Sequence, residues 1–294
     1  MRLPYSTLLA AVGLLATPFL VSAQGPIDGY VKKKGELDVA LGLSATGGSN
    51  FIDGDGGMVR QMFRGQLVGL YGAYGVTDQF NVVASVPYVV SETTSGLQDG
   101  SVHAKYRLLS KPIGAEEKRV GTLDIIASAG VQVPLSDYEV VANGAIGQRA
   151  QLVMPRLVTQ WNGRGYFVSA IAGYNYRFDG LDTQELARIQ ETRPGYQPEQ
   201  PADQVTALFR AGIPGRRFYV DAWLEIQRTL GGEDFTAGVE ELVQAYDVDY
   251  EQVGGTVYYS ESEHWGFAAG AARVIGGKNT SEFWRLTGTV VYKL

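Results

Sequence analysis

The stretch FWRLTGTVVYKL, residues 283–294, decides the fold. Its apolar positions alternate with polar ones, and the apolar set is Trp284, Leu286, Val290, Tyr292 and Leu294. The positions between them are Arg285, Thr287, Thr289 and Lys293, and only Val291 breaks the alternation. A period of two residues is typical of a β-strand with one face toward water and one toward apolar surroundings. We therefore expect an amphipathic strand at this end of the sequence.

The other end of the sequence has the features of a secretory leader. Arg2 gives a positive start, residues 8–21 form an apolar run, and Val21-Ser22-Ala23 supplies the compact residues of a cleavage site. A single membrane anchor is the alternative, but the run is short and contains a Pro and a Gly. We predict that residues 1–23 are a cleaved signal peptide and that residues 24–294 form one domain.

Composition limits the chemistry that is available. The sequence has no cysteine and a net charge of −6, which exclude thiolate metal sites and argue against a nucleic-acid partner. Glycine (38 residues) and tyrosine (17 residues) are both frequent. Glycine suits tight turns, and tyrosine suits the interface between a membrane and water. We expect no cofactor and no metal.

Alternation recurs along the whole sequence and predicts twelve strands. They span residues 35–45, 60–75, 79–91, 99–110, 120–133, 149–161, 165–178, 203–213, 217–229, 248–260, 264–275 and 282–294. Such lengths suit tilted strands that cross a membrane, which need about 9–11 residues. The links alternate between long loops (46–59, 92–98, 134–148, 179–202, 230–247 and 276–281) and mostly tight turns. An all-β, antiparallel, up-and-down transmembrane barrel of twelve strands explains this pattern, with short periplasmic turns and long extracellular loops.

The charged side of each strand must face inward, because a charge at the lipid midplane costs about 2–4 kcal/mol. The predicted lumen-lining residues are Asp38, His103, Lys105, Arg107, Asp124, Arg156, Arg177, Arg210, Asp221, Glu225 and Arg285. Two interpretations remain open for them. Ion pairs could fill a narrow interior, or the charges could line a polar conduit.

Aromatic residues cluster near the predicted strand ends, where they could form two girdles or line the interior. In the two longest loops, residues 182–189 and 239–243 could form short helices. The segment from Asp53 to Gly57 has two carboxylates but lacks the other ligand positions of a calcium loop.

Catalytic motifs are missing from the sequence. It contains no G-x-S-x-G, H-E-x-x-H, phosphate-binding loop or dinucleotide fingerprint. Ser101 and His103 share a predicted inner face, whereas a lipid-acting barrel enzyme would need its serine and histidine on the outer face. We therefore predict no enzymatic activity and keep the lipid-acting enzyme as a minor alternative.

Two segments carry a family resemblance. YGVTDQFNV (residues 74–82) and GLQDGSVHAKYRL (residues 96–108), with Val86-Pro87-Tyr88 between them, resemble recurrent motifs of the outer-membrane barrel family described as Putative MetA-pathway of phenol degradation. The resemblance is clearest over about residues 70–110. It implies a barrel that passes small compounds, aromatic or hydrophobic ones among them, and it implies no set of binding residues.

These observations predict a passive channel for small solutes in the outer membrane of a Gram-negative bacterium. Its expected partners are outer-membrane lipid, the barrel-assembly machinery (through the C-terminal strand) and a small-molecule solute. The alternatives are a structural or adhesive barrel with a plugged lumen, the lipid-acting enzyme and, least favoured, a secreted soluble β-sandwich.

Overall fold

The computed structural model describes residues 27–91, 94–114, 120–138, 146–147, 149–178, 202–232 and 247–294. The regular structure of these residues consists of β-strands. The strands are β1 (Leu37–Ile52), β2 (Met58–Gly75), β3 (Phe80–Val90), β4 (Ser95–Leu97), β5 (Asp99–Ile113), β6 (Gly121–Pro134), β7 (Leu152–Gly163), β8 (Phe167–Arg177), β9 (Gln204–Pro214), β10 (Phe218–Thr229), β11 (Asp249–Ser260), β12 (Trp265–Lys278) and β13 (Thr280–Lys293). None of the described residues form a helix that could cross a membrane.

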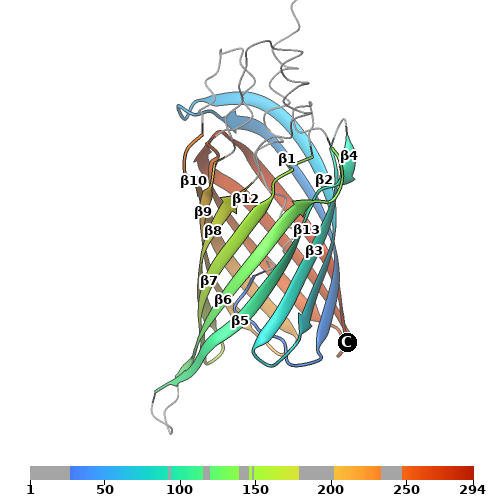
Figure 1. The fold of residues 1–294 in the computed structure, drawn as a ribbon, viewed down its shortest axis with the longest axis vertical. Coiled ribbons are helices and arrows are strands. Elements are labelled where there is room, and N and C mark those ends of the chain that lie inside the picture. Colours follow the sequence, from blue (N-terminus) through green and yellow to red (C-terminus); the bar gives the residue numbers. More distant parts are fainter. Residues whose placement is uncertain are drawn as a thin grey trace, which may run out of the picture.

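The strands form one closed antiparallel barrel (Figure 1). Apart from β4 and β5, strands that follow each other in the sequence are paired. The pairing of β1 with β13, from Asp38↔Lys293 to Ile52↔Thr280, closes the wall. The short β4 and the long β5 both pair with β3 and are separated only by Gln98. They therefore act as one strand of the wall. The twelve-stranded barrel expected from the sequence is confirmed.

The barrel is apolar outside and polar inside. Leu43 and Leu286 on the outer surface are 58% and 53% exposed, whereas Lys105 and Asp221 are 3% and 5% exposed. This distribution is the reverse of that in a soluble protein, where charged residues are rarely buried. It matches a transmembrane barrel, whose outer face meets lipid.

The two rims differ in their connections. The turns at residues 76–79, 164–166, 215–217 and 261–264 are short, and the C-terminus lies at the same end of the barrel (Figure 1). One such turn is held by the Thr77 hydroxyl, which accepts a hydrogen bond of 3.0 Å from the Phe80 amide. In outer-membrane barrels the end with short turns faces the periplasm. We call this end the periplasmic rim and the opposite end the outer rim.

Two expected outer loops are instead extensions of the strands. Residues 46–59 form the ends of β1 and β2 with a tight turn at residues 53–57, and residues 276–281 belong almost wholly to β12 and β13. The loop predicted at residues 46–59 was wrong because Gly47-Gly48 resembles a turn sequence. In the structure the Trp284 ring packs over Gly47, where a Cβ atom would lie 2.9 Å from it. At the second link, the ends of β12 and β13 pair with β11 and β1 rather than with each other, and Asn279 between them has φ 52°.

Three expectations lie outside the described residues. They are the signal peptide, the short helix at residues 182–189 and the helical turn at residues 239–243.

Candidate functional site

A segment that precedes the first strand lies inside the barrel. Residues 27–36, here called the N-terminal segment, enter the lumen at the periplasmic rim, as the blue trace inside the lower barrel of Figure 1 shows. Ile27 is 6% exposed and forms a buried cluster with Ile126, Val158 and Ile171 of β6, β7 and β8. Burial of an Ile side chain stabilises by about 1.5–3 kcal/mol. The segment therefore has an apolar anchor on the inner wall.

Polar contacts fix the rest of the N-terminal segment. The Lys105 ammonium donates to Asp28 Oδ1 at 2.7 Å, and both side chains are nearly inaccessible to solvent. The Asn81 amide makes two hydrogen bonds to the backbone of Lys32, accepting from its N–H at 2.7 Å and donating to its carbonyl at 3.1 Å. Lys32 also forms an ion pair with Asp38. Wall strands β1, β3 and β5 thus each hold the segment by a specific group.

The segment passes very close to the wall at Gly75. A Cβ atom at this position would lie 1.9 Å from the carbonyl oxygen of Lys33, which is a backbone atom and cannot rotate away. Gly75 therefore permits the close approach. Further inside, the Tyr30 ring meets the rings of Phe167 and Tyr219 edge-on, with centroids 5.9 and 6.4 Å apart.

Four of the predicted lumen-lining residues form pairs on neighbouring strands. Arg210 and Asp221, on β9 and β10, are both buried with Nε 3.2 Å from Oδ2, and Asp221 Oδ2 also accepts from the Tyr219 hydroxyl at 2.8 Å. Arg107 and Asp124 lie 3.9 Å apart, so their contact is weaker. The polar interior is therefore partly neutralised by its own wall.

A second group of the predicted residues lies deeper in the lumen. Glu225 Oε1 accepts from the Tyr250 hydroxyl at 3.2 Å, and the guanidinium groups of Arg285, Arg156 and Arg210 attract its carboxylate. Arg285 also donates to Gln252 at 3.2 Å. These side chains come from five strands, β7, β9, β10, β11 and β13. We call Arg156, Glu225, Tyr250 and Arg285 the central cluster.

The remaining predicted residues have varied surroundings. Asp38 pairs with Lys32 of the N-terminal segment, as described above. Arg177 is half-buried, and its backbone N–H donates to Asp203 at 2.9 Å. His103 is 3% exposed and packs over Gly130, where a Cβ atom would lie 2.1 Å from its Nδ1.

The Ser101–His103 pairing of the minor enzyme alternative is not formed. Ser101 Oγ lies 2.9 Å from Ser85 Oγ instead, and no hydrogen bond joins it to His103 within the described ranges. Those ranges also contain no group of three His, Asp or Glu side chains that could hold a metal ion.

A network of hydrogen bonds joins Asp99, Tyr138 and the backbone of residues 149–150 at the outer rim. Asp99 accepts from the Tyr138 hydroxyl at 2.5 Å and from the Ala150 amide at 3.1 Å, and Tyr138 accepts in turn from the Arg149 amide at 2.8 Å. Burial and the neighbouring Asp99 raise the pKa of Tyr138 above its usual value. The Tyr138 hydroxyl proton is donated to Asp99, which ties this residue to β5.

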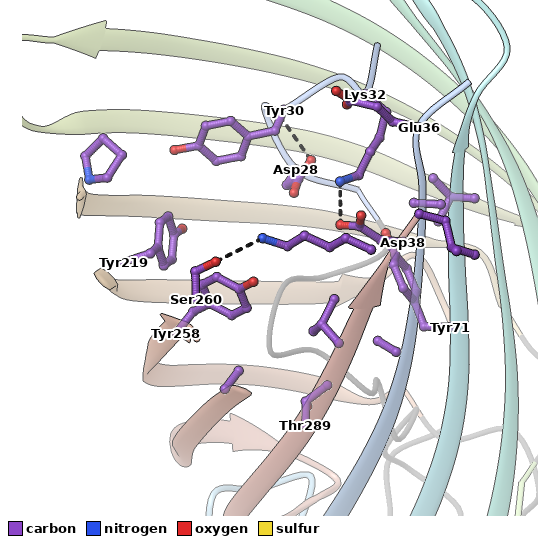
Figure 2. A pocket seen from close by; sticks show the side chains of 18 of the residues that line it. Asp28, Tyr30, Lys32, Glu36, Asp38, Tyr71, Tyr219, Tyr258, Ser260 and Thr289 are labelled. Carbon is purple, nitrogen blue, oxygen red and sulfur yellow. Dashed lines mark hydrogen bonds and ion pairs between the residues drawn. The ribbon is translucent and has the colours of Figure 1, made fainter. Parts of the chain in front are cut away.

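A cavity of about 630 Å³ lies between the N-terminal segment and the wall. Figure 2 shows Tyr30, Tyr219 and Tyr258 on one side of it and Tyr71 across from them. Its lining includes residues of the turns at 214–217 and 260–264 and the terminal Leu294, so it reaches the periplasmic rim. Tyr71 and Tyr258 are thus inner residues rather than members of an outer aromatic girdle.

Comparison with known proteins identifies the family. The family described as Putative MetA-pathway of phenol degradation matches residues 43–287. The chain belongs to this family. Its resemblance at residues 74–82 and 96–108 is therefore confirmed over most of the barrel. No curated protein matches the sequence.

Solved structures resemble the chain to different degrees. An outer-membrane channel from Pseudomonas putida F1 is 14% identical, with a TM-score of 0.59, and the alignment covers 90% of this chain and 97% of that one. The KdgM porin is 10% identical (86% and 98% covered, TM-score 0.46). The CymD monoaromatic hydrocarbon channel is also 10% identical (97% and 96% covered, TM-score 0.41). At such identities the first of these likenesses establishes a shared barrel fold.

Sequence reasoning missed the N-terminal segment. It shows no alternation, and its place depends on single contacts such as Asp28 with Lys105, which lie 77 positions apart. The available signal was a cluster of charged residues before the first strand, Lys32, Lys33 and Lys34. Such a cluster is equally typical of an exposed leader junction, so it could not show that the segment turns inward.

Proposed function

We propose that this protein is a passive outer-membrane channel for small solutes. The observation that carries the proposal is the polar interior, with a cavity of about 630 Å³ that reaches the periplasmic rim. Charged rings and polar linings are the means by which pores admit and select solutes. The family description supports aromatic or hydrophobic compounds as the solute class.

A second function is favoured by one specific observation. The N-terminal segment occupies part of the periplasmic half of the lumen and is held by the buried Lys105–Asp28 pair. A structural or adhesive barrel with a plugged lumen would use such a segment to close the interior. The two functions differ in whether the intact chain lets solute through.

The outer surface supports the proposed location and partners. Trp284, Leu286 and Val290 of β13 are exposed on the wall, where they would contact outer-membrane lipid. We propose that the barrel-assembly machinery binds this same C-terminal strand, after cleavage of the leader at residues 1–23. No enzymatic role is assigned, because the Ser101 hydroxyl is hydrogen-bonded to Ser85 on the inner face.

Single-channel recording in planar bilayers tests the proposal. We expect discrete conductance steps for the intact chain, together with swelling of liposomes in a small solute that does not cross the lipid by itself. The plugged barrel predicts that the intact chain gives neither signal, while a chain that lacks residues 27–34 conducts. Absence of conductance from the intact chain in both assays would overturn the channel.

A further inference from the structure

The cavity at the periplasmic rim has aromatic walls. Its lining includes the rings of Tyr30, Tyr71, Tyr219 and Tyr258, which come from the N-terminal segment, β2, β10 and β11 (Figure 2). A volume of about 630 Å³ is within the range of sites for small molecules, about 300–1,000 Å³. Aromatic side chains prefer to stack on, or meet edge-on, other planar rings. The walls therefore suit a flat aromatic ligand.

Two of the cations in this cavity are already neutralised. The Lys105 ammonium is bonded to Asp28 at 2.7 Å, and Lys32 is paired with Asp38. Paired charges offer little further attraction to a ligand, because each already has its counterion. Apart from Lys293, the other charged residues of the lining are exposed at its rim: Glu36, Arg216, Arg217, Glu263 and the terminal Leu294.

Lys293 of β13 has a different environment. Its ammonium lies 3.5 Å from Ser260 Oγ and 5.1 Å from the centroid of the Tyr258 ring. It forms no ion pair with a carboxylate of the described chain. The nearby hydroxyls of Tyr258 and Thr289 are buried, and within the same ranges neither has a hydrogen-bond partner. A cation without a carboxylate partner thus lies beside two hydroxyls without hydrogen-bond partners in an aromatic cavity.

From this arrangement we infer that the cavity binds a small aromatic carboxylate. The ligand carboxylate would be held by the Lys293 ammonium, and its ring would lie among the tyrosines. The Ser260 hydroxyl donates to the Ser262 carbonyl at 3.1 Å and accepts from Lys293, so it positions the ammonium. Because the cavity forms the periplasmic end of the proposed path, the inference rests on the proposed function and specifies a substrate class for it. A charge-assisted contact at one end and stacking at the other would discriminate against neutral and non-aromatic solutes.

Calorimetric titration of the full chain in detergent tests the ligand class without any substitution. Four probes separate the contributions: benzoate, benzyl alcohol (aromatic and neutral), benzylammonium (aromatic and cationic) and acetate (anionic and not aromatic). We expect benzoate to bind about tenfold more tightly than each of the others. Equal affinity for benzoate and benzyl alcohol, or for benzoate and acetate, would overturn the inference.

Substitutions then test the residue. Lys293→Gln should weaken benzoate binding about tenfold and leave benzyl alcohol unchanged, and Lys293→Arg should retain most of the benzoate affinity. Lys34→Gln is the matched control, because Lys34 is an exposed lysine outside the cavity lining. Unchanged benzoate affinity in Lys293→Gln contradicts the site. If that variant does not fold, the probe series on the intact chain still decides.

Binding and conduction are measured separately, so the two proposals can fail separately. A barrel that binds benzoate selectively but does not conduct keeps the site and loses the channel. A barrel that conducts but does not distinguish benzoate from benzyl alcohol keeps the channel and loses the site.

Discussion

The periplasmic half and the centre of the lumen are filled in different ways. In the periplasmic half, the N-terminal segment is a piece of chain that carries its own backbone into the lumen and is attached by a few contacts, such as Asp28 with Lys105. The centre is filled by side chains of the wall itself, the central cluster of Arg156, Glu225, Tyr250 and Arg285. The N-terminal segment could move out of the lumen without breaking a strand pair, whereas the central cluster consists of side chains of the wall strands.

The difference shows which part of the interior is able to control passage. The barrel closes through β1 and β13, and the Leu37 amide donates to the Leu294 carbonyl at 3.1 Å just after the N-terminal segment ends. Wall closure therefore does not need residues 27–34. Removal of the Glu225 carboxylate instead leaves the guanidinium groups of Arg156 and Arg285 without the negative charge that attracts them, which affects the stability of the barrel. Segment contacts should mainly affect conduction, and central contacts should mainly affect stability.

The largest expected effect comes from deletion of residues 27–34. We expect the barrel to fold, because every strand pair is retained, and its single-channel conductance to rise severalfold, because the segment no longer occupies the lumen. Planar-bilayer recording measures the change. An unchanged conductance would mean that the constriction lies in the central cluster instead.

A reversible cross-link is the control for this deletion. The chain has no cysteine, so Gly29→Cys combined with Gln160→Cys introduces a unique pair. A Cβ atom at Gly29 would lie 2.8 Å from Gln160 Cβ, so a small shift brings the two into disulfide range. The oxidised protein should not reach the conductance of the deletion variant, and reduction should restore the behaviour of the intact chain.

The second prediction concerns the central cluster. Glu225→Gln removes the carboxylate whose charge attracts Arg156 and Arg285, and we expect the free energy of unfolding to fall by about 2–3 kcal/mol. Urea unfolding in lipid vesicles measures this change. Glu251→Gln is the control, because Glu251 pairs with Arg228 at 2.5 Å in a solvent-accessible position and should lose less than about 1 kcal/mol. An equal loss in the free energy of unfolding in the two variants would show that the central cluster contributes no more to stability than the exposed Arg228–Glu251 pair.

The third prediction uses two glycines of β2. A Cβ atom at Gly75 would meet the Lys33 carbonyl at 1.9 Å, whereas at Gly72 the nearest atom is 4.0 Å away. Gly75→Ala should therefore push the segment off the wall at a cost of about 2 kcal/mol, and Gly72→Ala should leave it in place. A spin label on Lys34→Cys reports the motion. Similar label mobility in both variants would show that Gly75 does not hold the segment.

Much of the wall could be predicted from the sequence, and much of the lumen could not. The alternation that places Leu286 outside and Arg285 inside repeats along every strand, because lipid and water impose it locally on each residue. The lengths of β1 and β2 at the outer rim were underestimated, because Gly47 and Gly48 look like turn residues. The Trp284 ring that covers Gly47 is distant in sequence, so it could not be anticipated. The hydrogen bonds between Asn81 and the backbone of Lys32 leave no periodic trace at all.

The smallest effect is expected at the pair that joins the segment to the wall. Asp28→Asn removes one charge but keeps an oxygen that can accept from Lys105 and from the Tyr30 amide, so we expect the segment to lose about 1 kcal/mol of its attachment. The mobile fraction of the Lys34→Cys label should then rise about fivefold. A double-mutant cycle with Lys105→Met isolates the pair. If the two substitutions have independent, additive effects on label mobility, the Asp28–Lys105 contact does not hold the segment, and its apolar anchor at Ile27 must do so.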